Sequence, residues 1–180
     1  MTITGGCRCG AVRYRIEAEP LFTRHCWCRD CQYISAGAGT VNVFFPSEAV
    51  TVEGALADYA SKAESGNQMH RHFCAACGTP VFTQSEARRQ YIGVRAGTLD
   101  DPELGKPQMA IWTSSAPSWA AFDPTIPQER SNPHRPSRKG DEELAAPLQG
   151  SADTSGGAAE QSSGLRRRVR RASPSRARAR

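Results

Sequence analysis

The chain has 180 residues with a formal net charge of +5, and hydrophobic residues make up 38% of it, which fits one domain with a remainder. Residues 131–180 hold 11 Lys and Arg against 5 Asp and Glu, a net of +6, so residues 1–130 carry −1 and a basic binding face on the folded part is not implied. No stretch approaches 18 apolar residues, which excludes a membrane-spanning helix.

Short β-like runs, separated by glycine and proline, follow the first cysteines. Residues 11–16 alternate apolar and charged side chains, which is typical of a half-buried strand. Residues 40–45 are β-branched and aromatic and stop at Pro46. Further strands are predicted at 50–52, 56–60, 79–83 and 90–95, and short helical turns at 32–36 and 96–104. The sequence therefore predicts a small all-β domain.

The composition changes after a proline-punctuated segment at residues 123–127, and the domain is predicted to end near Arg130. Residues 131–180 are rich in Arg, Ser, Ala and Gly and contain no aromatic residue. Such a segment cannot bury enough apolar surface to offset its ordering entropy, so disorder is predicted. Residues 165–180 hold eight Arg and no acid, a composition that can bind nucleic acid through phosphate contacts. They lack aromatics for base stacking, and a specific role is not favoured.

The seven cysteines are expected to be reduced. Residues 1–6 carry no charged side chain, and Cys7 precedes any apolar run, so no secretory signal is expected and a cytoplasmic location is predicted. In a reducing cytosol thiols serve metals or catalysis more often than disulfides. An odd number of cysteines also cannot pair completely.

Two cysteine pairs predict one closed zinc site. Cys7 and Cys9 are two residues apart, so in an extended strand both sulfurs project from the same face. Cys74 and Cys77 form a C-x-x-C-G zinc-knuckle pattern, in which Gly78 allows the unusual backbone angles after the second ligand. Four sulfurs at about 2.3 Å from an ion complete a tetrahedron, as in structural zinc sites.

A third cluster, Cys26, Cys28 and Cys31, lies within six residues, and no eighth cysteine exists to complete its shell. His25 should point to the opposite face of an extended segment, so it is not favoured as a fourth ligand. Zinc held by three protein groups keeps a position for water or substrate, and a thiol suits that position. An open metal site is predicted, with a metal-free cluster or a site closed by another ligand as the alternatives.

Three other interpretations bear on function. A thioredoxin-like redox pair needs a βαβ setting, and no helical run supplies one. His70 and His72 are interpreted as polar surface groups or partners of the ligands, since four cysteines already fill the nearest site. Arg95 could bind a substrate carboxylate through its guanidinium fork, but a solvated charge on a strand face is the favoured interpretation.

Around its cysteine motifs the chain resembles the glutathione-dependent formaldehyde-activating enzyme and centromere protein V family. The matching stretches occur in family order and cover residues 5–14, 26–32, 72–82, 95–102, 111–112 and 117–119. The resemblance implies a β-tent fold, in which small twisted antiparallel sheets are clasped by a zinc. It also implies carbon–sulfur lyase chemistry, which joins or splits formaldehyde and glutathione as S-hydroxymethylglutathione.

The resemblance assigns roles to all seven cysteines and two Zn²⁺ per chain. The structural zinc would be held by Cys7, Cys9, Cys74 and Cys77, and the labile, catalytic zinc by Cys26, Cys28 and Cys31. The chain departs from the family at Trp27 and Ala110, where many members have histidine. The predicted function is a zinc-dependent lyase acting on a thiol adduct of a small aldehyde, with a glutathione-like thiol as partner and no membrane partner. The alternative is a non-catalytic zinc module that contacts nucleic acid through its basic tail.

Overall fold

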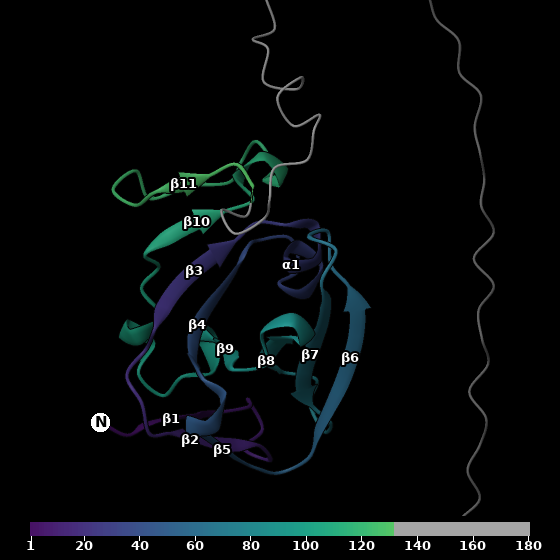
Figure 1. The fold of residues 1–180 in the computed structure, drawn as a ribbon, viewed down its shortest axis with the longest axis vertical. Coiled ribbons are helices and arrows are strands. Elements are labelled where there is room, and N and C mark those ends of the chain that lie inside the picture. The colour runs from purple at the N-terminus through teal and green to yellow at the C-terminus, as the bar shows by residue number, and fades with distance from the viewer. Residues whose placement is uncertain (132–180) are drawn as a thin grey trace, which may run out of the picture. The chain divides into compact units, whose positions relative to one another are not determined.

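Two sheets and one short helix form the part of the chain that the computed structural model describes, residues 1–131. This confirms the predicted all-β class. The smaller sheet contains, in spatial order, β1 (Ile3–Gly6), β2 (Arg13–Ile16) and β5 (Val50–Glu53). The larger sheet is ordered β11 (Gln128–Glu129), β10 (Met109–Ile111), β3 (Phe22–Cys26), β4 (Thr40–Pro46), β9 (Tyr91–Arg95), β8 (Pro80–Ser85), β7 (Gln68–Cys74) and β6 (Leu56–Lys62) (Figure 1). The predicted disorder beyond residue 131 lies outside the described residues.

Strand pairing is antiparallel, as predicted, except at β10. This strand runs parallel to both β3 and β11, with Ala110 opposite His25 and Gln128. Parallel neighbours need a crossover connection. Between β9 and β10 the chain passes through two 3₁₀ turns, η3 (Ala96–Thr98) and η4 (Pro102–Gly105), where the sequence predicted helical turns. The pairing of β10 places the residues after it beside the end of β3.

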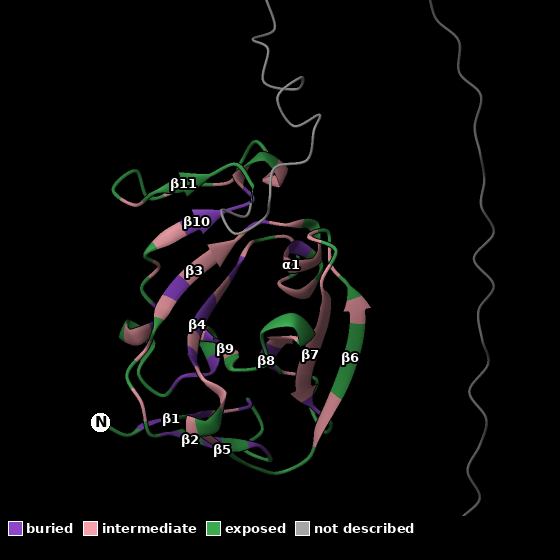
Figure 2. Ribbon diagram, in the orientation of Figure 1, coloured by how far each residue is buried: buried purple, intermediate pink, exposed green. Residues whose placement is uncertain are grey.

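Residue alternation gives the larger sheet one apolar face and one polar face. Val43 and Phe45 on β4, Phe82 on β8 and Val94 on β9 are each at most 1% exposed. They form one core cluster with Tyr14 and other side chains of the smaller sheet. Buried positions accordingly occur on strands of both sheets (Figure 2). The opposite face carries the polar and charged side chains together with Phe22 and Phe44, and several of these residues line a cavity. The core therefore holds the two sheets together and leaves the other face of the larger sheet for the site.

Helix α1 (Arg29–Ile34) begins three residues before the predicted helical turn at 32–36. The remaining 3₁₀ turns are η1 (Ser47–Ala49), η2 (Glu86–Arg88) and η5 (Thr113–Ser115). Strands β1, β3, β7, β10 and β11 were not predicted. Among residues 1–131, no helix is long and apolar enough to cross a membrane.

Candidate metal centres and active-site cavity

The four cysteines of the two separated pairs converge on one point. Their sulfur atoms all lie within 4.8 Å of one another. The Sγ–Sγ distance is 3.5 Å from Cys7 to Cys9 and 3.9 Å from Cys9 to Cys74. Four sulfurs at about 2.3 Å from one ion are ~3.8 Å apart, whereas a disulfide needs ~2.0 Å. The cluster thus has the dimensions of a tetrahedral metal site, and all of its cysteines are free thiols.

A tight turn after the second cysteine pair shapes one half of this cluster. Gly78 has a φ of 72° and follows the Cys74–Cys77 knuckle, where its N–H donates to the carbonyl oxygen of Cys74 at 2.9 Å. Positive φ is the conformation that glycine adopts without a steric cost. The hydroxyl and the backbone of Thr79 interact with Cys77 and lower the pKa of this thiol to about 5. The knuckle therefore favours a thiolate, which is the form that binds zinc.

The cluster of Cys26, Cys28 and Cys31, called the triad below, lies where β3 passes into α1. Cys26 ends the strand, Cys28 is the residue that precedes the helix and Cys31 is within it, and their sulfurs lie within 4.8 Å of one another. Hydrogen bonds with Cys26 and Cys28 lower the pKa of the Cys31 thiol well below its ordinary value. Hydrogen bonds with Cys28 and Cys31 raise the pKa of the Cys26 thiol well above its ordinary value. Three soft sulfur donors this close to one another are a ligand set that Zn²⁺ accepts, so the cluster fits this metal.

The helix is held against the strand by Gln32, which is only 3% exposed. Its Nε2 donates to the carbonyl oxygens of Trp27 at 2.7 Å and of Ser115 at 2.8 Å. The Trp27 ring is 3% exposed and contacts the rings of His25 and Phe122 at centroid distances of 4.9 and 5.5 Å. Neither His25 nor Trp27 lines the cavity or joins the metal-binding clusters found in residues 1–131.

Arg95 is connected to the triad through a chain of polar groups. Its Nη1 donates to Asn42 Oδ1 at 2.8 Å, Asn42 Nδ2 donates to Thr40 Oγ1 at 3.2 Å, and Thr40 Oγ1 donates to Cys31 Sγ at 2.9 Å. Burial lowers the pKa of Arg95, while the charge of Cys31 opposes this shift. Arg95 is only 8% exposed, so its interpretation as a solvated surface charge is wrong. It supplies a buried positive charge beside the thiols.

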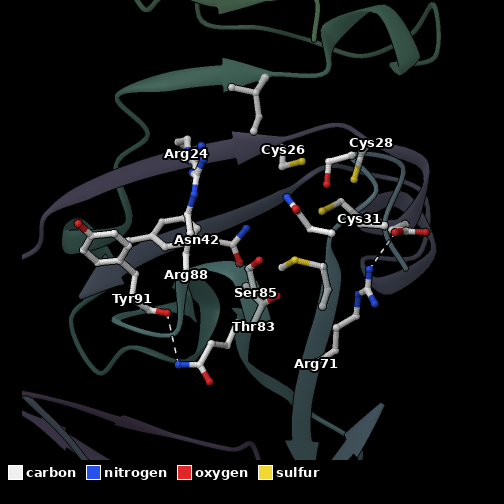
Figure 3. Close-up of a pocket in the computed structure, with 18 of the residues that line it drawn as sticks. Arg24, Cys26, Cys28, Cys31, Asn42, Arg71, Thr83, Ser85, Arg88 and Tyr91 are labelled. Atoms are coloured by element: carbon white, nitrogen blue, oxygen red, sulfur yellow. Dashed lines mark hydrogen bonds and ion pairs between the residues drawn. The ribbon is translucent and has the colours of Figure 1, made fainter. Parts of the chain in front are cut away.

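A cavity of about 750 Å³ extends from the triad along the polar face of the larger sheet. The triad and Arg71 lie at one end of it, and Arg24, Arg88 and Tyr91 at the other (Figure 3). Arg71 Nη2 pairs with Asp30 Oδ2 at 2.8 Å. Sequence reasoning missed Arg24, Arg71 and Arg88. For Arg24 a signal existed, because it is two residues before Cys26 and therefore on the same face of an extended strand.

Ala110, the second departure from the family, directly precedes two residues that line the cavity. Ala110 is 1% exposed and does not line the cavity, while Ile111 and Trp112 after it do. Trp112 has a φ of 61° and a ψ of 35°, a left-handed conformation that is costly for a bulky residue. This conformation turns the chain into η5, whose Ser115 carbonyl accepts the hydrogen bond from Gln32. The segment after β10 therefore supports both the cavity wall and the triad loop.

The chain is similar to a small number of known proteins. Residues 2–115 match the glutathione-dependent formaldehyde-activating enzyme family. A Halomonas elongata protein provisionally named a glutathione-dependent formaldehyde-activating enzyme is 25% identical over 130 residues, which cover 68% of this chain and 82% of that protein. A crystal structure of a Rhodobacter sphaeroides protein is 24% identical with a TM-score of 0.46, covering 58% of this chain and 96% of that one.

Proposed function

Because the chain belongs to the glutathione-dependent formaldehyde-activating enzyme family, we propose that it is a zinc-dependent carbon–sulfur lyase. Its substrate would be a thiol adduct of a small aldehyde, such as S-hydroxymethylglutathione. The observation that carries the proposal is the position of the triad, in which three thiols converge at the end of a large cavity. We assign the catalytic zinc to Cys26, Cys28 and Cys31, and the structural zinc to Cys7, Cys9, Cys74 and Cys77.

The reaction separates RS–CH₂–OH into a thiolate, formaldehyde and a proton. The carbon–sulfur bond breaks with its electron pair left on sulfur, and the carbon–oxygen double bond forms as the hydroxyl proton leaves. Zinc would supply a Lewis-acidic position that keeps the thiol ionised at neutral pH. Three thiolates and Zn²⁺ carry a net charge of −1, which the buried guanidinium of Arg95 balances.

The walls of the cavity would position the two reactants. Thr40 and Asn42 fix the orientation of Cys31 and Arg95 through the hydrogen bonds described above. A volume of about 750 Å³ leaves room for a thiol of tripeptide size, and holding thiol and aldehyde together can supply much of the acceleration. Asp30, an acidic residue of the lining, is held by Arg71, so we expect the hydroxyl proton to pass to solvent.

The proposal is tested by the splitting of S-hydroxymethylglutathione by the zinc-loaded chain, corrected for the uncatalysed rate. We expect turnover that is lost in Cys28→Ser while the circular dichroism spectrum is unchanged. Tyr33→Phe is the matched control, since this tyrosine is on the same helix but is 80% exposed and outside the cavity lining. If the wild-type chain with two zincs shows no turnover on a panel of thiols, the lyase assignment fails and a non-catalytic zinc module becomes the better description.

A further inference from the structure

Unsatisfied polar atoms in the described part of the chain are concentrated in the cavity. Five buried side-chain nitrogen or oxygen atoms of residues 1–131 lack a hydrogen-bond partner. Four of them belong to residues that line the cavity: Arg24 Nε, Arg24 Nη1, Ser85 Oγ and Arg95 Nε. Buried polar groups in native proteins are nearly always paired, and an unpaired donor costs about 1–3 kcal/mol. Donors gathered in one cavity therefore indicate a ligand with acceptor atoms.

Arg24 is a partly buried arginine of the cavity that contacts aromatic rings but has no polar partner among the described residues. Its guanidinium carbon lies 4.7 Å from the ring centre of Phe22 and 4.8 Å from that of Phe44, and these two rings stack on each other at 4.6 Å. Within residues 1–131 its side chain forms no hydrogen bond or ion pair.

The other cationic groups of the cavity are already compensated. Arg71 pairs with Asp30, and Arg95 is bonded to Asn42 and faces the thiols. Arg24 and Arg88 lie together at the far end of the cavity (Figure 3), and Glu64 is the remaining acid of the lining. This end therefore carries an excess of positive charge. Phe22 and Phe44 form an aromatic floor under the Arg24 guanidinium, and two nitrogens of this group are buried, which strengthens their attraction for an anion.

The distance along β3 indicates where the anion lies relative to the substrate sulfur. Phe22 and Cys26 end the same five-residue strand, so their Cα atoms are ~13 Å apart, and the Arg24 guanidinium lies over the Phe22 end. The guanidinium is thus on the order of 10 Å from a sulfur bound at the triad. An extended residue spans about 3.3–3.6 Å. A carboxylate one or two residues away from the thiol-bearing residue can reach Arg24, whereas the carboxylate of free cysteine cannot.

The geometry points to a carboxylate subsite formed by Arg24 and Arg88, which binds the end of a peptide-like thiol whose sulfur lies at Cys26, Cys28 and Cys31. This inference rests on the proposed function and specifies its substrate class. The guanidinium fork binds carboxylate and phosphate alike. A carboxylate is preferred because the peptide-like thiol of the proposed function carries carboxylates and no phosphate. The subsite would select peptide thiols against small uncharged thiols.

The test is calorimetric binding of S-methylglutathione to the zinc-loaded full chain. This analogue keeps both carboxylates but cannot present a thiolate, so the measurement does not depend on turnover. We expect Arg24→Gln and Arg88→Gln each to weaken binding at least tenfold, about 1.4 kcal/mol. Arg89→Gln is the matched control, because Arg89 adjoins Arg88 and is exposed but does not line the cavity. Arg88 is exposed, so its replacement leaves the core intact and keeps the test valid even if Arg24→Gln unfolds.

Analogues separate the remaining outcomes. Amidation of the carboxylates should weaken binding to the wild-type chain as much as Arg24→Gln does, with no further loss when the two changes are combined. Equal binding by the variants and the wild type would overturn the subsite. Tighter binding of a phosphate-bearing S-methyl thioether than of S-methylglutathione would overturn the carboxylate assignment. If S-methylglutathione binds as expected but no thiol adduct is turned over, the subsite stands and the lyase function fails.

Discussion

A mild chelator should remove the two zincs in separate steps. The two sites cross-link the chain very differently, because Cys9 and Cys74 are 65 residues apart whereas Cys26 and Cys31 are both within one short segment. By loop-closure entropy, a cross-link over 65 residues restricts the unfolded chain by ~4 kcal/mol and one over five residues by ~2 kcal/mol. Domains of this size are stabilised by only about 5–15 kcal/mol. Binding of a structural zinc further contributes on the order of 10 kcal/mol to folding. Loss of the four-thiolate zinc should therefore unfold the protein, whereas loss of the triad zinc, which closes only a short loop, should not.

The assay follows zinc release with a chromogenic chelator alongside circular dichroism. We expect one zinc to leave quickly with an unchanged spectrum, because a chelator can enter the open position of the triad. A second zinc should leave slowly, at the rate of unfolding.

Two variants assign the phases. Cys28→Ser should remove the fast phase and keep the fold, and Cys74→Ser should give a chain that unfolds or aggregates at a much lower temperature. Release of both zincs together with the fold would refute this reasoning. A single zinc per chain from the start would refute it as well.

Three further predictions follow from the contacts around the sites. Arg95→Met should weaken zinc binding at the triad on the order of tenfold, because a buried charge-assisted hydrogen bond contributes about 1.5–3 kcal/mol. Arg95→Lys should recover part of the lost affinity. Chelator competition measures the zinc affinity, and equal affinities of variant and wild type would contradict the prediction. Hydrogen bonds to Asp58 and then Glu86 raise the pKa of His70, so its stabilising effect is complete below the ordinary value of 6.5 and is lost as the pH rises through the raised value. Urea unfolding should therefore separate wild type from His70→Gln more at pH 6 than at pH 8.5, and an equal separation would refute the ion pair. A chain ending at Arg130 should melt within about 2 °C of the full chain with the same zinc content, and a larger drop would show that the tail contributes to stability.

The sequence predicted the parts of the fold in which alternation reflects burial against a core. Residues 11–16 were predicted as a strand because apolar and charged side chains alternate there, and β2 shows this alternation of buried and exposed positions. The two cysteine clusters could be predicted because short spacings fix which sulfurs meet. The large separation between Cys9 and Cys74 did not matter, since a tetrahedral ion needs four thiolates and the pairs supply them.

The rest could not be predicted because the polar face of the larger sheet lines a cavity. Polar residues on β3 and β7 look like solvent-facing ones in the sequence, so Phe22–Cys26 and Gln68–Cys74 were not identified as strands. Arg95 was interpreted as a surface charge for the same reason. Only the pairing of β3 with β4, and of β4 with β9, places Arg24, Asn42 and Arg95 on one wall. Such long-range register leaves no local pattern in the sequence.

The most direct test of the account is cadmium NMR of the chain with both metal sites loaded with cadmium. The account predicts two resonances, one from the four-thiolate site and one from the triad. Only the triad resonance should shift when glutathione is added, because only that site has a position for the substrate sulfur. Cys28→Ser should alter that resonance alone. A single resonance, or two resonances that glutathione leaves unchanged, would contradict the assignment of an open, substrate-binding metal site to Cys26, Cys28 and Cys31.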